Sequence, residues 1–354
     1  MTQSIRKAVK DTPAYPFQAI DVPVKLDQNE NPYDFPAELK AKVAERILSV
    51  PFNRYPDLHA DRLKVAIGKY ENWNPEGIVV TPGSNVLLHQ LTSLAGLRQR
   101  VLTVKPTFAV YTLEASLLES ELTLVPLNAD FSLPVEALKA ELQKGGPGIF
   151  YITEPHAPTG KLDSKEEVEA LLEVAQQHGW LSVVDEAYYQ FGGNDFRYTV
   201  EKYRNVIITR TFSKAWGLAG LRLGYALTTV ELATELQKLV SAFNVNALTT
   251  AAVEVALENP EYVQKIADEQ CSERDRMVEA LQKHPTWKVY PSATNFFLVR
   301  TPNASEAYQG LIQHGVLVRR QDSGFMLEGV LRVSVGTPEE NDTFLDAAFK
   351  VQAE

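Results

Sequence analysis

Residues 205–228, NVIITRTFSKAWGLAGLRLGYALT, decide the fold that we expect. The stretch begins and ends with short apolar runs of the kind found in buried strands, and a lysine and a glycine-punctuated turn lie between them. Similar runs occur upstream at residues 77–83, 100–106, 121–127, 148–155 and 181–187, with helical patterns between them. This alternation indicates a three-layer α/β/α domain with a mainly parallel sheet. Ligands of such sheets bind at the carboxyl ends of the strands, so the residues there are the candidates for a site.

The rest of the chain divides around this region. Residues 1–45, rich in proline and asparagine, are expected to form an arm with little regular structure that belongs to a smaller domain. Residues 46–246 form the expected large domain. Residues 247–354 are expected to contain a linking helix, broken near Pro260, and a small α/β domain with strands near 287–301 and 315–337.

The composition excludes several classes of protein. The chain has 35 Lys and Arg against 45 Asp and Glu, and the resulting net charge of -10 argues against nucleic-acid binding. It has no apolar run near the roughly 20 residues that cross a bilayer and no signal-like start, so we expect a cytoplasmic protein. Cys271, the single cysteine, is interpreted as structural. The dinucleotide and triphosphate motifs G-x-G-x-x-G and G-x-x-x-x-G-K-[ST] are also missing from the expected places.

Lys214 follows one of the predicted strands. A lysine in this place is more often a solvated surface charge. Here its apolar neighbours, Phe212 and Trp216 among them, would desolvate the ammonium and favour the neutral amine that a Schiff base requires. Ser213 and Arg222 could together hold an anion, although Arg222 could equally be a surface charge before a strand.

Three further strand ends carry candidate residues. Asp185 ends an apolar strand, and a buried carboxylate needs a cationic partner such as the pyridinium nitrogen of pyridoxal phosphate; the alternative is a helix cap. Gly83 and Ser84 precede a predicted helix whose N-terminus favours a phosphate, although Ser84 could simply be an N-cap. Phe108 could stack on a flat ring or belong to the core. The coincidence of these groups with Lys214 indicates one site.

Short motifs through nearly the whole chain carry a resemblance to a known family. They are LDQNENP (26–32), NRYPD (53–57), TPGSN (81–85), KPTFAVY (105–111), PTGKL (158–162), VVDEAYYQF (183–191), TFSKAWGLAGLRLGY (211–225), ATNFFLVR (293–300) and LRVSVGTPEEN (331–341). In this order they resemble the fold-type I, class II pyridoxal-phosphate-dependent aminotransferases, and most closely the histidinol-phosphate aminotransferases.

The resemblance implies a role for each candidate residue. Lys214 would bind the cofactor covalently and act as general acid and base, Asp185 would pair with the pyridinium nitrogen, and Tyr188 would contact the ring 3′-oxygen. The remaining cofactor contacts would come from Phe108, stacked on the ring, and from phosphate-binding residues Ser84, Asn85, Ser213, Arg222 and, from the other subunit of a homodimer, Tyr55. The substrate would be bound by Arg332 at a carboxylate, by Arg319 and Tyr15 at a phosphate, and by Asn31.

The implied reaction moves an amino group between L-histidinol phosphate and 2-oxoglutarate, in a ping-pong cycle through pyridoxamine phosphate that serves histidine biosynthesis. Aromatic amino-acid transamination and threonine-phosphate decarboxylation stay open, as does a non-catalytic binding module of the same fold. One departure from the family is Ala157 in HAPTG, where the usual N-P-T-G loop has an asparagine that donates to the ring 3′-oxygen. His156 or a water could take its place.

Overall fold

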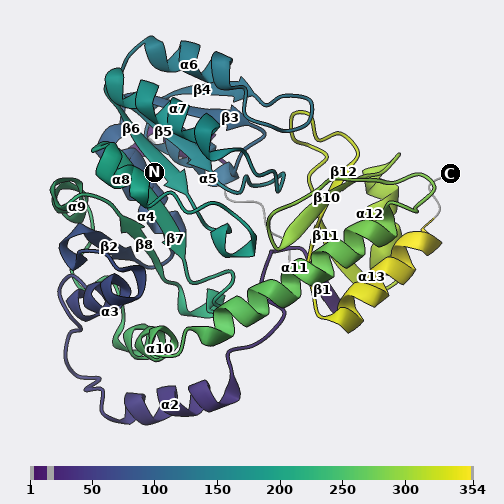
Figure 1. The fold of residues 1–354 in the computed structure, drawn as a ribbon, viewed down its shortest axis with the longest axis horizontal. Helices are drawn as coiled ribbons and strands as arrows, with labels where there is room; N and C mark the ends of the chain where they lie inside the picture. Colours follow the sequence, from purple (N-terminus) through teal and green to yellow (C-terminus); the bar gives the residue numbers. More distant parts are fainter. Residues whose placement is uncertain (1–3, 14–19, 352–354) are drawn as a thin grey trace.

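The computed structural model describes residues 4–13 and 20–351, and within them the chain forms two β-sheets joined by a long helix (Figure 1). The larger sheet has the strand order β2-β8-β7-β6-β5-β3-β4. Its strands are β2 (Ile78–Thr81), β3 (Arg100–Lys105), β4 (Glu121–Pro126), β5 (Gly148–Thr153), β6 (Trp180–Asp185), β7 (Val206–Thr211) and β8 (Gly224–Leu227). Only β8 runs antiparallel to its neighbours in this described sheet, so the predicted mainly parallel sheet is confirmed.

Helices cover both faces of the larger sheet because alternate residues of its buried strands point to opposite sides. On β5, for example, Phe150 packs into one core cluster and Tyr151 into another. The second cluster is completed by α4 (Ser84–Ala95), α5 (Ala109–Leu117) and α9 (Val230–Gln237). The first is completed by α3 (Asp61–Glu71), α6 (Val135–Gln143), α7 (Lys165–Gln177) and α8 (Tyr198–Lys202), with the short turns η2 (Pro75–Gly77), η3 (Tyr189–Phe191) and η4 (Ala219–Leu221) between elements. The predicted three-layer α/β/α arrangement is therefore confirmed.

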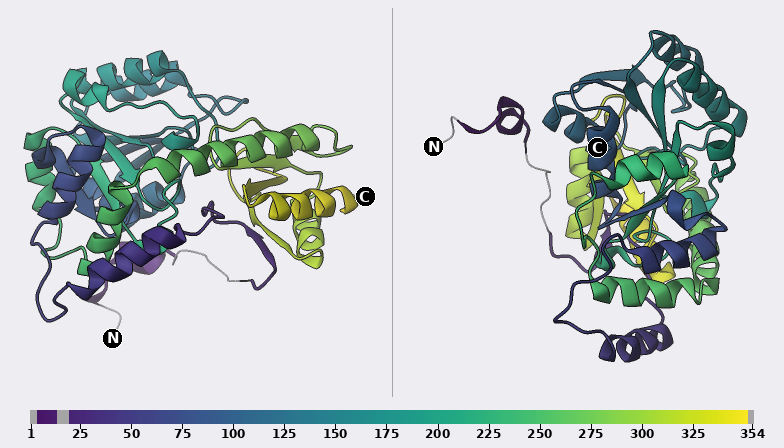
Figure 2. Two further views of the ribbon diagram at one scale, coloured as in Figure 1. Left: turned by 60° about the horizontal axis from the view of Figure 1, so that its bottom comes forward. Right: turned by 90° about the vertical axis from the view of Figure 1, so that its left-hand side faces the viewer.

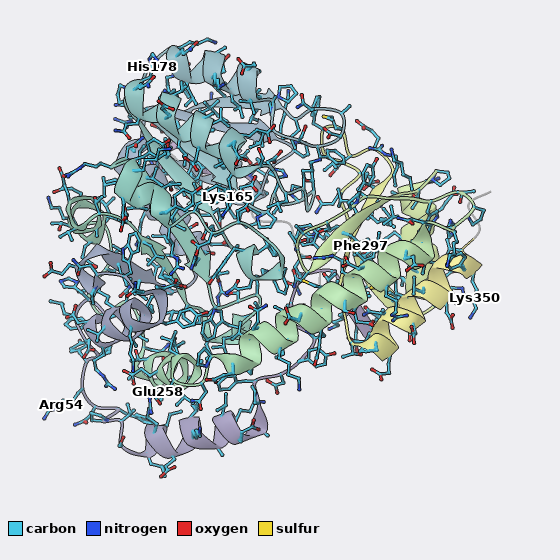
Figure 3. All side chains as sticks on the ribbon, in the orientation of Figure 1. Arg54, Lys165, His178, Glu258, Phe297 and Lys350 are labelled. Atoms are coloured by element: carbon cyan, nitrogen blue, oxygen red, sulfur yellow. The ribbon has the colours of Figure 1, made fainter. Side chains whose placement is uncertain are left out.

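The smaller sheet has the order β1-β11-β12-β10-β9. Its strands are β1 (Val24–Leu26), β9 (Lys288–Val289), β10 (Phe296–Arg300), β11 (Val316–Arg320) and β12 (Val330–Ser334). The helices α12 (Ala304–Gln313) and α13 (Pro338–Lys350) pack against it. Phe297, labelled in Figure 3, lies edge-on to Phe344 of α13, with ring centroids 6.4 Å apart.

Two helices connect the sheets: α10 (Ala247–Leu257) and α11 (Glu261–Leu281). Pro260 stands directly before α11, so the predicted break is confirmed, and its physical cause is the N–H that proline lacks. In the left view of Figure 2, α11 extends from the larger sheet to the smaller one. None of the helices in the described ranges is both long and apolar enough to cross a membrane.

The N-terminal segment has more regular structure than its composition predicts. It contains α1 (Lys7–Asp11), β1, and α2 (Ala37–Leu48), which crosses residue 45. α2 forms because residues 37–48 are mostly strong helix formers, and it is fixed to the end of α10 by Arg46, which donates to Glu258 at 3.0 and 2.8 Å. β1 pairs with β11 at the edge of the smaller sheet. The proposed domain limit at 45/46 falls inside α2. This limit and the one at 246/247 remain proposals.

Candidate active site

The turn after β7 presents Lys214 toward the segment that follows β1. Its Nζ donates to the carbonyl oxygens of Gln28 and Asn29, both at 3.1 Å, and lies 5.6 Å from the centroid of the Tyr188 ring. The turn is closed by Gly217, which has φ +67° and donates from its N–H to the carbonyl of Lys214 at 2.9 Å. The lysine is half-buried, while its apolar neighbour Phe212 is part of the core.

Asp185 ends β6 as a buried carboxylate. Its Oδ2 accepts from the Tyr111 hydroxyl at 2.8 Å, and its Oδ1 accepts from the N–H of Ala187 at 3.2 Å. Burial raises the pKa of Asp185 above its usual value, and the bond from Tyr111 opposes that shift. Asp185 forms no ion pair with any residue that the structure describes, so the carboxylate is suited to a cationic group of a ligand.

An anion-binding cradle forms where β2 meets α4. Gly83 is the N-cap of α4 with φ +83°, and a Cβ placed there would lie only 2.5 Å from Arg222 Nη2. Arg222 Nη1 donates to Ser213 Oγ at 3.3 Å, which joins the turn after β7 to the same place. The first turn of α4, with Ser84 and Asn85, has no acidic residue. Backbone N–H groups at this helix end, together with the guanidinium, fit a phosphate.

The smaller sheet contributes two arginines. Arg319 on β11 and Arg332 on β12 are direct cross-strand partners. Arg332 Nη2 donates to the carbonyl of Asp27 at 2.8 Å, and its guanidinium carbon lies 5.4 Å from the centroid of the Phe296 ring. Directly opposite residues of paired strands point to the same face of a sheet, so these two arginines together suit an anionic substrate.

Comparison with known proteins gives the family. The family model described as aminotransferase class I and II matches residues 21–347. The chain belongs to this family. The histidinol-phosphate aminotransferase of Deinococcus radiodurans is 58% identical over 97% of this chain and 95% of its own length, and that of Thermococcus gammatolerans is 38% identical over 93% and 92%. The solved structure of histidinol-phosphate aminotransferase from Sinorhizobium meliloti in complex with pyridoxal-5′-phosphate has the same fold, with a TM-score of 0.88, 24% identity, and coverage of 99% of this chain and 97% of that one.

Class I and II aminotransferases depend on pyridoxal phosphate, and the residues of this aminotransferase fit that cofactor. The cradle formed by Gly83, Ser84, Ser213 and Arg222 suits its phosphate, and the buried Asp185 suits its ring nitrogen. Lys214 supplies a primary amine. Phe108 lies at the N-cap of α5, edge-on to Tyr111 with ring centroids 5.7 Å apart. These candidates lie at strand ends of the larger sheet or in the turns and helix N-termini that follow them, and their contacts with the cofactor stay predictions.

Asn29 is a residue of this aminotransferase site that sequence reasoning missed. Its Nδ2 donates to the Tyr188 hydroxyl oxygen at 3.0 Å, and its Oδ1 accepts from Ser334 Oγ at 3.0 Å. Because Tyr188 accepts this bond, its own proton remains available to donate to another acceptor. The predicted Asn31 donates to the carbonyl of Ala215, the residue after Lys214, at 3.1 Å. Asn29 has φ +54°, a left-handed conformation that asparagine tolerates better than most residues. A single sequence does not show which asparagine adopts this conformation.

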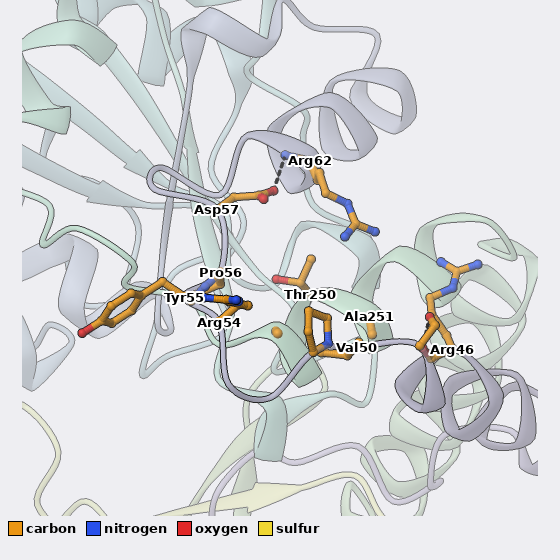
Figure 4. A pocket seen from close by; sticks show the side chains of 12 residues that line it. Arg46, Val50, Arg54, Tyr55, Pro56, Asp57, Arg62, Thr250 and Ala251 are labelled. Atoms are coloured by element: carbon orange, nitrogen blue, oxygen red, sulfur yellow. Dashed lines mark hydrogen bonds between the residues drawn. The ribbon is translucent and has the colours of Figure 1, made fainter.

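The predicted cofactor residue Tyr55 lies on an exposed segment between α2 and α3. Tyr55 is 83% exposed and stacks on Phe243 with ring centroids 4.7 Å apart; it lines a pocket with Arg54 and Thr250 (Figure 4). A single described chain thus does not bring Tyr55 to Lys214. The predicted substrate residue Tyr15 lies outside the described residues.

The loop that departs from the family pattern is buried. Ala157 is in the core, and the preceding His156 has its Nδ1 2.8 Å from Thr159 Oγ1. Burial lowers the pKa of His156 to about 3, so the imidazole is neutral near pH 7. Its Nε2 is buried without a hydrogen-bond partner among the described residues. The imidazole therefore has one nitrogen left to serve as the substitute donor that the sequence suggested.

Proposed function

We propose that this aminotransferase transfers the amino group between L-histidinol phosphate and 2-oxoglutarate, yielding imidazole acetol phosphate and L-glutamate for histidine biosynthesis. The observation that carries the proposal is the 58% identity, over 97% of the chain, to the histidinol-phosphate aminotransferase of Deinococcus radiodurans. The paired Arg319 and Arg332 agree with it, because the two alternating substrates carry a phosphate and carboxylates.

When bound, pyridoxal phosphate supplies an aldehyde that accepts the amino group and a pyridinium ring that withdraws electrons from the reacting carbon. Lys214 serves as general base for the proton on the amino-bearing carbon and returns it as general acid. Asp185 would keep the pyridinium nitrogen of the cofactor protonated. Tyr188 accepts a hydrogen bond from Asn29, so its own hydroxyl proton is free to be donated to the ring 3′-oxygen. Arg332 and Arg319 bind the anionic ends of the substrates and orient them.

A donor screen tests this function against the alternatives. Purified enzyme is given 2-oxoglutarate with histidinol phosphate, phenylalanine or threonine phosphate, and both glutamate and released carbon dioxide are measured. We expect glutamate chiefly from histidinol phosphate and none from Lys214→Ala, which lacks the amine. Preference for phenylalanine would assign an aromatic aminotransferase, carbon dioxide from threonine phosphate would assign a decarboxylase, and turnover by Lys214→Ala equal to wild type would remove the proposed mechanism.

We further propose that the enzyme is a cytoplasmic homodimer in which Tyr55 reaches the cofactor phosphate of the partner subunit. Large apolar side chains cluster near Tyr55 on the exposed segment, with Leu48 88% and Phe52 75% exposed, and such a surface favours association. Sedimentation velocity measures the oligomeric state. A monomer at micromolar concentration with full activity would contradict the shared site.

A further inference from the structure

Tyr111 on α5 has no role in the function proposed above, yet it makes a direct side-chain contact with Asp185. Its hydroxyl lies 2.8 Å from Asp185 Oδ2 and 2.8 Å from Thr153 Oγ1, and the side chain is 1% exposed. An ionised carboxylate only accepts hydrogen bonds, so the single Tyr111 proton is donated to Asp185. Thr153 must then donate to the Tyr111 oxygen. The two bonds form a directed chain of donors that ends on the carboxylate.

The Tyr111 ring is held in place from two sides. It stacks on Tyr151 with ring centroids 4.5 Å apart and an interplanar angle of 10°, and it meets the edge of Phe108. The Tyr151 hydroxyl is engaged elsewhere, at 2.8 Å from Thr92 Oγ1. Since packing fixes the ring, the hydroxyl of Tyr111 has a defined position for the bond to Asp185.

We propose that Tyr111 is a positioning residue that keeps the Asp185 carboxylate oriented and ionised, and that it thereby sets how strongly Asp185 holds the protonated ring nitrogen of the cofactor. The inference rests on the proposed function only in requiring that pyridoxal phosphate binds next to Asp185. It does not depend on which amino donor the enzyme uses. The other groups that stabilise the Asp185 carboxylate are the N–H of Ala187, which donates to it at 3.2 Å, and the hydroxyl of Thr209, which also lowers its pKa. Without the Tyr111 hydroxyl, the carboxylate becomes more basic, and the shared proton moves from the ring nitrogen toward Asp185.

Tyr111→Phe tests the proposal, because it keeps the stacked ring and removes only the hydroxyl. We expect the dissociation constant of pyridoxal phosphate, measured by adding cofactor to the apoprotein, to rise roughly tenfold to a hundredfold, as for loss of a hydrogen bond to a charged group. The pH titration of cofactor absorbance should also move. Tyr151→Phe is the matched control, since it removes an equally buried hydroxyl that does not touch Asp185. It should lower the melting temperature similarly and leave the dissociation constant and titration within about twofold of wild type.

A double-mutant cycle with Asp185→Asn separates positioning from a general structural effect. If Tyr111 acts through the carboxylate, adding Tyr111→Phe to Asp185→Asn changes cofactor affinity by less than about threefold. An equal loss in both backgrounds, or an equal loss in Tyr151→Phe, would overturn the inference. Should Tyr111→Phe not fold, Thr153→Val removes the preceding donor and should shift affinity in the same direction, and an unchanged affinity there would also overturn it. This cycle measures cofactor affinity, whereas the donor screen measures substrate preference. A wrong histidinol-phosphate assignment would therefore change the donor screen and leave the cycle unaffected.

Discussion

Replacing Arg222 by alanine tests the phosphate cradle. The guanidinium lies against the N-cap Gly83 of α4 and donates to Ser213 Oγ at 3.3 Å, so the substitution removes the cationic part of the cradle and leaves the helix N-terminus intact. A hydrogen bond to a charged group contributes about 1.5–3 kcal/mol, whereas the helix end alone contributes about 0.3–1 kcal/mol. Loss of the larger contribution predicts a dissociation constant for pyridoxal phosphate roughly 10- to 150-fold higher.

The assay is equilibrium binding of pyridoxal phosphate to apoprotein, followed by absorbance. Arg98→Ala is a matched control, because Arg98 is also exposed and also in the left-handed region, with φ +52° against φ +51° for Arg222. Its partner is Glu119, at 3.3 Å, outside the site. We expect similar melting temperatures for the two variants and weaker cofactor binding only in Arg222→Ala. Affinity within about twofold of wild type would refute the placement of the phosphate at α4.

Three further predictions concern substrate, cofactor and stability. Arg319→Ala should raise KM for histidinol phosphate far more than for glutamate, whereas Arg332→Ala should impair both, each at a cost of about 2–5 kcal/mol; equal losses in Arg319→Ala would show that Arg319 does not bind the phosphate. Ala157→Asn should move the pH titration of the bound-cofactor absorbance down by about one unit by restoring an N–H donor, and an unmoved titration would place HAPTG away from the ring. The pKa of His156 is lowered to about 3 in the folded protein. Between about pH 6.5 and 3 the unfolded chain therefore binds a proton that the folded chain does not. As the pH falls through this range, the free energy of unfolding should decrease by up to about 1.4 kcal/mol per pH unit. In denaturant unfolding, His156→Gln should have a shallower decline, and an identical slope would argue against a neutral buried imidazole.

The sequence was sufficient to predict that Asp185 ends a strand and that Lys214 follows one. In a parallel sheet the strand ends share one edge, so Asp185 and Lys214 could be grouped from their places after apolar runs alone. The contacts that support them were not predictable in this way. The bond from Tyr111 to Asp185 spans 74 residues, and that from Asn29 to Tyr188 spans 159. Both depend on side-chain packing between elements whose relative position a single sequence does not specify.

The N-terminal segment shows a second limit. Its proline and asparagine content predicted irregular structure, but local composition does not reveal that β1 completes the smaller sheet or that α2 packs on α10. Tyr55 illustrates a third limit, since its predicted contact with the cofactor needs a second copy of the chain. Secondary-structure propensity describes a segment in isolation, whereas tertiary packing determines which secondary structure the segment adopts.

The segment after β1 contacts both Arg332 and Lys214. The carbonyl of Asp27 accepts from Arg332, and the next two carbonyls, of Gln28 and Asn29, accept from Lys214 Nζ. Three consecutive residues therefore contact both the group proposed to bind the substrate anion and the group proposed to move its proton. β1 pairs with β11, and β11 pairs with β12, which carries Arg332, so the segment that follows β1 is anchored to the sheet that contains Arg332.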